Sequence, residues 1–268
     1  MTTLLAVDIG NTQVKMGVFD GERLTATWRF STDSRRTEDE HELLIAGLLH
    51  SRGVDPTALG AIVMCSVVPP VTRLVEQSLA QLTGHSPLMV GPGIKTGIQI
   101  RYDRTQDVGS DRIADAVAAH AMCDGPVIVV DFGTATKFEA ITQAGEYMGG
   151  AIAPGLLVAA EALYQRTAQL RRVEVIPPET AIGRNTVASL QSGIVYGYVG
   201  LVEGLVRRIK KELCPDDPGK CMVIATGGLA PLIHSHTDVF DELNQELTLE
   251  GLRLIHERNS DRSNRPEP

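Results

Sequence analysis

The chain has 268 residues, of which 43% are hydrophobic and 22% are charged, and its mean hydropathy is 0.00. This composition is typical of a globular chain and excludes a disordered or fibrous one. Asp and Glu outnumber Lys and Arg by 33 to 25, which gives a net charge of −8, whereas proteins that bind nucleic acid generally carry excess positive charge. The length favours one large or two small domains.

The apolar runs, such as 126–131, are too short to cross a bilayer, and the first residues show no leader-like pattern. Cysteine usage indicates reduced thiols rather than disulfides or a zinc site, since no Cys-x-x-Cys pair occurs among Cys65, Cys123, Cys214 and Cys221. We therefore expect a cytoplasmic protein that handles small molecules, with no membrane and no nucleic acid as partner.

Apolar patterning and turn residues predict the elements of the first half. Three strands at 4–8, 14–19 and 24–30 are joined by two turns, the second of which has the Asp-Gly chemistry of a hairpin. A helix at 38–51, a strand at 61–67, a helix at 70–82 and a strand at 87–90 follow. A loop at 91–104 leads to a helix at 107–122, whose alanine-rich face is suited to close packing.

The opening pattern recurs in the second half. Strands at 127–131, 136–142 and 147–153 precede helices at 156–165 and 185–213, a strand at 222–225 and a last helix at 241–258. Self-similarity over about half the chain predicts an α/β fold with two domains of one plan. The domains would be 1–123 and 124–258, followed by a polar tail at 259–268. Packing of the last helix back on the first domain is left open as an alternative.

In each half a buried strand ends at an aspartate that begins a turn with Gly and Thr, in Asp8–Thr12 and Asp131–Thr134. The glycine lets backbone amides approach phosphate oxygens closely, the threonine adds a donor, and the carboxylate can hold a cation. Lys15 and Lys137 follow the turns and could add positive charge. A single copy is equally well explained as a tight turn, but two copies favour a phosphate site.

Four further segments leave alternatives open. Gly109–Asp115 begins a helix, where Asp111 and Arg112 suit either an anion site or simple support of the helix dipole. Gly149–Gly155 suits a phosphate platform or close packing of strand and helix. Gly183–Thr186 precedes a long helix, so Asn185 or Thr186 is either its N-cap or a ligand contact. Thr226–Gly228 resembles a nucleotide-base site only weakly.

Taken together, these segments resemble the type III pantothenate kinases, a family in the acetate kinase, sugar kinase, Hsp70 and actin superfamily. The residues that carry the resemblance follow the family's order: Asp8–Thr12, Gly109–Arg112, Asp131–Thr136, Gly149–Gly155 and Gly183–Thr186. The paired aspartate turns mark the superfamily only. Gly-x-Asp-Arg followed by Gly-Gly-x-Ile-x-Pro-Gly is much more specific to this kinase family.

The resemblance implies two ribonuclease-H-like domains with ATP in the cleft between them, and a homodimer that pairs around 107–122 with pantothenate near the subunit interface. It implies transfer of the γ-phosphoryl group of ATP to the primary hydroxyl of pantothenate, the first step of coenzyme A biosynthesis. Asp111 would be the general base, Asp8 would steer Mg²⁺, and Asp131 would bind a monovalent cation, K⁺ or NH₄⁺. ATP would contact Asp8, Ile9, Gly10, Asn11, Thr12, Gln13, Val14, Lys15 and Thr134. Pantothenate would contact Tyr102, Gly109, Ser110, Asp111, Arg112 and Thr186.

Two positions depart from the family's pattern. The family usually has a threonine where this chain has Lys137, and often a proline at the position of Thr105. Lys137 leaves the phosphate role of Asp131 and Thr134 in place but leaves the fine geometry of that turn open.

Two other hypotheses stand beside a pantothenate kinase. One is a kinase or phosphatase of the same superfamily that acts on another small alcohol or phosphate. The other is a regulatory binding protein that keeps the fold without turnover. A degenerate copy would have lost Asp8, Asp111 or Asp131, so their presence favours an enzyme.

Overall fold

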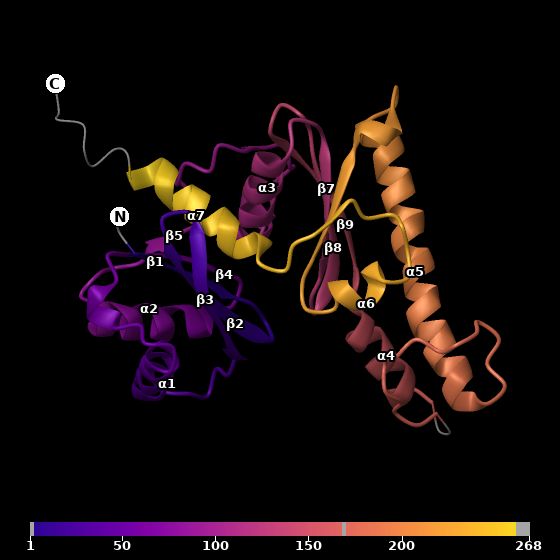
Figure 1. Ribbon diagram of the computed structural model, residues 1–268, viewed down its shortest axis with the longest axis horizontal. Coiled ribbons are helices and arrows are strands. Elements are labelled where there is room, and N and C mark those ends of the chain that lie inside the picture. The colour runs from indigo at the N-terminus through magenta and orange to yellow at the C-terminus, as the bar shows by residue number, and fades with distance from the viewer. Residues whose placement is uncertain (1–2, 168–169, 261–268) are drawn as a thin grey trace. The chain divides into compact units, whose positions relative to one another are not determined.

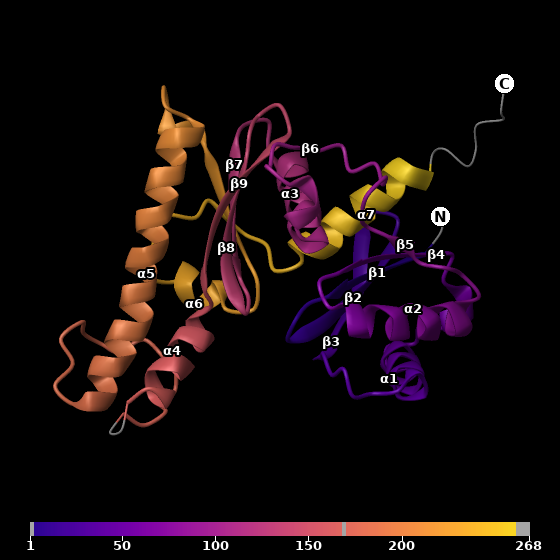
Figure 2. The ribbon, with the colours of Figure 1, turned by 180° about the vertical axis from the view of Figure 1, so that it is seen from behind.

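The computed structural model describes residues 3–167 and 170–260, which form two compact units (Figure 1 and, from behind, Figure 2). Within these residues the first unit comprises 3–98, 104–118 and 247–260, and the second comprises 99–103 and 119–246. Each unit is an α/β layer structure built on one mixed sheet.

The first unit has a five-stranded sheet with the order β3-β2-β1-β4-β5. The strands are β1 (Thr3–Ile9), β2 (Gln13–Asp20), β3 (Arg23–Ser31), β4 (Ala61–Ser66) and β5 (Leu88–Met89). Strand alternation sends Leu5, Val7 and Ile9 to the face that is covered by α1 (Glu38–His50) and α2 (Pro69–Thr83). The opposite face packs on α7 (Leu247–Ser260), since a Cβ on Gly17 of β2 would lie 2.7 Å from Cδ1 of Leu249.

The second unit has a six-stranded sheet with the order β11-β10-β7-β8-β9-β6. The strands are β6 (Gln99–Ile100), β7 (Val127–Phe132), β8 (Ala135–Ile141), β9 (Glu146–Pro154), β10 (Met222–Thr226) and β11 (Glu242–Leu243). The long α5 (Thr186–Leu213) covers one face, where Val202 and Val206 join the core formed with Phe138. The shorter helices are α4 (Leu156–Gln165) and α6 (Ala230–His234), and 3₁₀ turns lie at Pro56–Ala58, Thr105–Asp107 and Pro218–Lys220.

The two sheets repeat one strand plan, in which β3-β2-β1-β4-β5 corresponds to β9-β8-β7-β10-β11. In both, the first strand forms an antiparallel hairpin with the second and lies parallel to the fourth. The hairpin registers also correspond, because Asp8 lies opposite Lys15 in one and Asp131 lies opposite Lys137 in the other. The predicted α/β duplication is therefore confirmed.

The C-terminal segment differs from the helix predicted at 241–258. The amide of Asp241 donates to the carbonyl of Val223 at 2.9 Å, and the Asp241 carboxylate accepts from the amide of Val223 at 2.8 Å. The chain therefore continues beside β10 as β11, and α7 begins only at Leu247. This helix belongs to the first unit, which is the alternative that the sequence left open for the last helix. Of the predicted tail, Asn259 and Ser260 end α7, and 261–268 lie outside the described residues.

The helix predicted at 107–122 is α3 (Ser110–Met122), and it begins later because Thr105–Asp107 form a 3₁₀ turn. Its alanine-rich face is used inside the chain. Ala114 is fully buried, and a Cβ on Gly251 of α7 would lie 1.9 Å from the Ala114 carbonyl oxygen. This contact takes up the face around Ala114, and pairing of subunits around 107–122 stays a prediction.

The segment 91–104 is not wholly a loop, since β6 within it pairs with β9 in parallel. All four cysteines are free thiols, as predicted. In the part of the chain that the structure describes, no helix is long and apolar enough to cross a membrane.

His41 is a buried histidine of α1 that lies against Phe30, with ring centroids 6.3 Å apart, and neither of its ring nitrogens has a hydrogen-bond partner among the described residues. Burial, and then the charge of Arg36, lower the pKa of His41 below its ordinary value. The unfolded chain therefore binds this proton at higher pH than the folded chain does. The free energy of unfolding should consequently fall as the pH drops below about 6.5.

We expect His41→Leu to flatten this decline between about pH 7 and pH 5, measured by urea unfolding. His50→Leu, at the exposed end of the same helix, is the matched control and should keep the slope of the parent chain. An equally steep decline in His41→Leu would show that another group titrates.

Candidate active site

The first aspartate turn follows β1 in the first unit. The amide of Gly10 donates to the carbonyl of Gln13 at 3.0 Å, and the Thr32 hydroxyl donates to the Gly10 carbonyl at 2.6 Å. Asp8 is half-buried at the strand end, while Asn11, Thr12 and Gln13 are exposed. Of the residues predicted to contact ATP, Ile9 and Val14 have fully buried side chains, so only their backbone can face a ligand.

The Asp8 carboxylate has a hydrogen-bond donor that the sequence did not indicate. Cys65 lies beside it in the parallel register of β4, and the thiol donates to Asp8 Oδ1 at 3.2 Å. Burial raises the pKa of Cys65 well above its ordinary value, and the charges of Asp8, Asp111 and Asp115 raise it further. The thiol therefore stays protonated and remains a donor to the Asp8 carboxylate.

The Gly-x-Asp-Arg segment is tied to the same sheet through Ser110, the first residue of α3. Its hydroxyl donates to the carbonyl of Ser66 and accepts from the amide of Ser66, both at 3.1 Å. Asp111 Oδ1 accepts the amide of Arg112 at 2.8 Å, and a Cβ on Gly109 would lie only 2.4 Å from that oxygen. A Cβ at position 109 would therefore displace the Asp111 carboxylate from this place, and Arg112 beside it is 6% exposed.

The second aspartate turn follows β7 in the second unit. Lys137 Nζ lies 2.8 Å from Asp131 Oδ2, and each of the two side chains is 16% exposed. The amide of Gly155 donates to the carbonyl of Thr134 at 2.9 Å, and a Cβ on Gly155 would lie 2.3 Å from that oxygen. The close approach explains why the Gly149–Gly155 segment ends in glycine, while Thr134 itself is exposed.

Gly227 lies against the other side of Asp131. It has a φ of +92°, and a Cβ there would lie 2.5 Å from Asp131 Oδ1. The segment Thr226–Gly228, which resembles a nucleotide-base site only weakly, thus lies against the Asp131 carboxylate.

Tyr102 and Thr186 both lie in the second unit, in different settings. The Tyr102 ring packs on Gly149, where a Cβ would lie 2.9 Å from Cε2, and it is tilted against Tyr147 with ring centroids 6.3 Å apart. The Tyr147 hydroxyl in turn donates to the fully buried carboxylate of Glu139. Thr186 is exposed at the start of α5, and the cap of that helix is Asn185, which accepts the amide of Ala188 at 2.9 Å.

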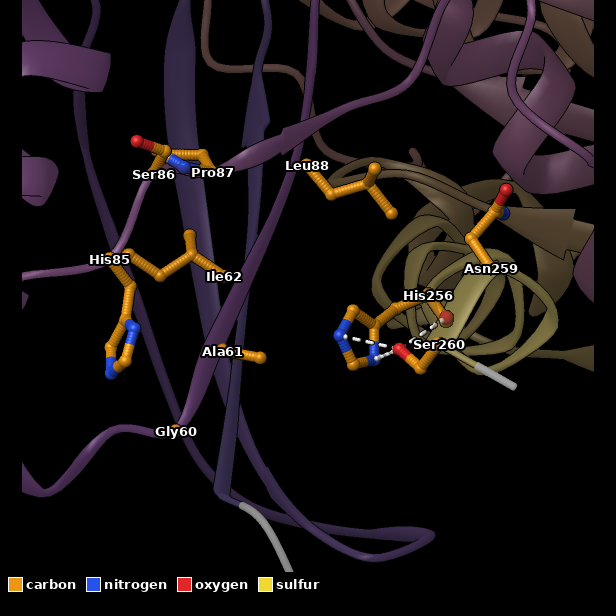
Figure 3. A pocket seen from close by; sticks show the side chains of 10 residues that line it. All are labelled: Gly60, Ala61, Ile62, His85, Ser86, Pro87, Leu88, His256, Asn259 and Ser260. Carbon is orange, nitrogen blue, oxygen red and sulfur yellow. Dashed lines mark hydrogen bonds between the residues drawn. The ribbon is translucent and has the colours of Figure 1, made fainter. Parts of the chain in front are cut away.

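A hollow of about 410 Å³ in the first unit involves none of these residues (Figure 3). It is lined by β4, the segment around β5 and the end of α7, where the Ser260 hydroxyl lies 3.0 Å from His256 Nε2. Burial lowers the pKa of His256. The functional candidates therefore remain the two aspartate turns and the start of α3, rather than this hollow.

The site residues divide between the units. In the first unit the structure brings Asp8, Cys65 and Asp111 close to one another, and in the second it brings Asp131, Lys137 and Gly227 together. No group of three or more His, Cys, Asp or Glu side chains within 3–167 and 170–260 is arranged to hold a metal ion. Sequence reasoning missed Cys65, whose partner Asp8 is distant in the chain, and the hydrogen-bonded pair of Tyr147 and Glu139, which joins the neighbouring strands β9 and β8.

Two units of one strand plan, each with an aspartate turn after its first strand, define the chain as an actin-like α/β protein of duplicated ribonuclease-H-like units. Two solved structures share this fold over almost the whole chain. A conserved Baf family transcriptional activator from Campylobacter jejuni is 17% identical, with a TM-score of 0.58 over 96% of this chain and 99% of that one. The ethanolamine utilization protein EutJ from Carboxydothermus hydrogenoformans is 15% identical, with a TM-score of 0.50 over 95% and 90%.

The chain belongs to the type III pantothenate kinase family, whose model matches residues 4–208. A type III pantothenate kinase of Moorella thermoacetica is 47% identical over 257 residues, covering 96% of this chain and 100% of that protein. Another, of Geobacter sulfurreducens, is 50% identical over 256 residues, covering 96% and 99%. The chain is therefore a kinase. This outcome favours an enzyme over the alternative hypothesis of a regulatory binding protein without turnover.

Proposed function

We propose that this chain transfers the γ-phosphoryl group of ATP to the primary hydroxyl of pantothenate, the first step of coenzyme A biosynthesis. The observation that carries the proposal is family membership over nearly the whole chain, joined with an intact Asp8, Asp111 and Asp131 at the ends of their elements. The reaction would take place in the cytoplasm, in keeping with four free thiols.

Asp111 is assigned as the general base. The pantothenate hydroxyl oxygen forms a bond to the γ-phosphorus, its proton passes to the Asp111 carboxylate, and the bond from the γ-phosphorus to the bridging oxygen of ADP breaks. The start of α3 also offers amides and a helix dipole that stabilise anionic charge. Pantothenate would be held there by Gly109, Ser110 and Arg112, and in the second unit by Tyr102 and Thr186.

ATP phosphates are assigned to the turn from Asp8 to Lys15 and to Thr134. Mg²⁺ keeps several waters and is usually held by one or two carboxylates together with substrate phosphates. The half-buried Asp8 at its strand end fits such an ion, directly or through water, and the Cys65 thiol would hold the carboxylate in place. When bound, the ion offsets charge on the transferring phosphates.

The monovalent cation that the family resemblance implies at Asp131 does not fit this chain. The Lys137 ammonium already lies 2.8 Å from Asp131 Oδ2. No step of the proposed mechanism therefore passes through such an ion.

The proposal is tested by measuring ADP release with ATP, Mg²⁺ and pantothenate, against a panel of other primary alcohols including sugars. Pantothenate should give the highest kcat/KM, and mass spectrometry should find a phosphomonoester of pantothenate. Preference for another alcohol would assign the chain to a different substrate within the superfamily.

A homodimer is also proposed, through a surface of the second unit. Its exposed side chains on β9 and α4 include Met148 and Ile152, 48% and 62% exposed, and Leu157 and Val158, 53% and 45% exposed. A contiguous apolar patch marks an interaction surface, and we propose that these four side chains form one. Sedimentation should therefore give about twice the chain mass of 28.8 kDa.

Ile152→Glu should shift that equilibrium to the monomer, because a charge would be buried at the interface. Leu43→Glu, on the exposed face of α1 in the first unit, is the matched control and should sediment like the parent chain. A monomeric parent chain, or a dimer unaffected by Ile152→Glu, would contradict this interface.

A further inference from the structure

The strand-end carboxylate of the second unit is already paired with a cation of the chain itself. Lys137 lies directly opposite Asp131 in the antiparallel register of β7 and β8, so both side chains leave the same face of the sheet. The Nζ–Oδ2 distance of 2.8 Å is that of a charge-assisted hydrogen bond. Each side chain is 16% exposed, so the pair is well shielded from solvent.

Two glycines flank the Asp131 carboxylate. A Cβ on Gly227 would lie 2.5 Å from Asp131 Oδ1, and a Cβ on Gly133 would lie 3.7 Å from either carboxylate oxygen. Backbone thus approaches the carboxylate closely at Gly227, while Lys137 reaches the other oxygen from the neighbouring strand.

We propose that the Lys137 ammonium takes the place of the free monovalent cation, so that ATP binding and turnover in this chain are independent of K⁺ and NH₄⁺. The ammonium group carries the same unit charge as these ions and resembles NH₄⁺ in its donors. A free cation at the same carboxylate would meet the charge of Lys137 and be repelled. The consequence for turnover rests on the proposed function, whereas the consequence for ion binding does not.

The duplicated strand plan supports this assignment. Lys15 lies opposite Asp8 in the first unit, as Lys137 lies opposite Asp131 in the second. In both sheets, therefore, a lysine occupies the position that lies across the hairpin from the strand-end aspartate. The threonine usual at position 137 in the family that the sequence resembles carries no charge and would leave Asp131 to an external ion.

The test compares KCl with tetramethylammonium chloride at equal ionic strength, since the organic cation is much larger than K⁺ and cannot donate a hydrogen bond. For the parent chain, the melting temperature, the Kd for ATP and kcat/KM should be the same in both salts. Lys137→Thr should bind K⁺, seen as a saturable rise in melting temperature in KCl alone. Its affinity for ATP should fall by roughly tenfold to a hundredfold in tetramethylammonium chloride and be restored by K⁺.

Two further variants control for the loss of a lysine as such. Lys137→Met removes the charge without adding an oxygen, and its loss of ATP affinity should be restored less by K⁺ than that of Lys137→Thr. Lys220→Thr breaks an exposed pair in the same unit, in which Nζ lies 3.6 Å from Asp217 Oδ2, and should behave like the parent chain in both salts.

Stabilisation of the parent chain by K⁺ relative to tetramethylammonium would overturn the proposal, as would a Lys137→Thr variant that folds but does not respond to K⁺. If Lys137→Thr fails to fold, the salt independence of the parent chain and the behaviour of Lys137→Met still decide. The salt pattern in melting temperature, without turnover of pantothenate, would support the Lys137 assignment while removing the proposed substrate.

Discussion

Replacing Asp111 by asparagine is expected to lower kcat by roughly 10²–10⁴-fold, since asparagine keeps the shape of the side chain but cannot take the proton of the substrate hydroxyl. The amide of Arg112 would still find an oxygen acceptor, so the start of α3 should stay intact. The melting temperature and the Kd for ATP should accordingly remain near those of the parent chain. Steady-state kinetics with calorimetry measure all three quantities.

The control for this variant is Asp107→Asn, in the exposed 3₁₀ turn just before α3. It removes an acidic charge near the same helix N-terminus and should leave kcat almost unchanged. Asp115 is a poor control, because it is 1% exposed and accepts the Thr248 hydroxyl at 2.6 Å. A kcat of Asp111→Asn near that of the parent chain would remove Asp111 from the chemistry and leave catalysis to positioning alone.

Gly251→Ala should be strongly destabilising, because its Cβ would lie 1.9 Å from the Ala114 carbonyl oxygen and 2.5 Å from the carbonyl carbon. Those atoms belong to backbone of α3 and cannot move aside like a flexible side chain. Overpacking of this kind costs about 1–3 kcal/mol or more in the free energy of unfolding. Thermal unfolding should show a melting temperature lower by roughly 3–10 °C.

Gly47→Ala is a control that should change the free energy of unfolding in the opposite direction. Gly47 lies inside α1, and a Cβ there would meet nothing within 4 Å. Alanine is a better helix former than glycine, so this variant should gain about 0.5–1 kcal/mol. Equal melting temperatures for the two variants would show that α7 does not pack on α3 as closely as described.

Local sequence signals sufficed for the two aspartate turns and the strands before them. The aspartate turns end strands of four or more apolar residues, and the first turn is closed by the hydrogen bond from the Gly10 amide to the Gln13 carbonyl. Because a hairpin pairs residues close in the chain, the opposition of Asp8 and Lys15 follows from the turn itself. The repeated pattern likewise indicated a duplicated fold, since both halves begin with an apolar strand that ends at an aspartate turn.

Elements whose partners are distant in the chain could not be placed in this way. Residues 241–246 have the composition of a helix start, but hydrogen bonds from Asp241 and Asn244 to β10 make them extend its sheet. The position of α7 depends on Gly251 fitting against Ala114, more than a hundred residues earlier, and helical periodicity does not specify which unit a helix covers.

The α/β class, the two strand-end aspartates and the resemblance to a kinase family could all be predicted from the residues alone, because these depend on local spacing and chain order. Long-range packing decided that the Cys65 thiol donates to Asp8 and that α7 belongs to the first unit. The tertiary structure also decided that Lys137 pairs with Asp131, since the turn leaves the lysine opposite the carboxylate but does not fix where its long side chain ends. Side-chain partners are chosen by packing and charge across strands, which residue order alone does not specify.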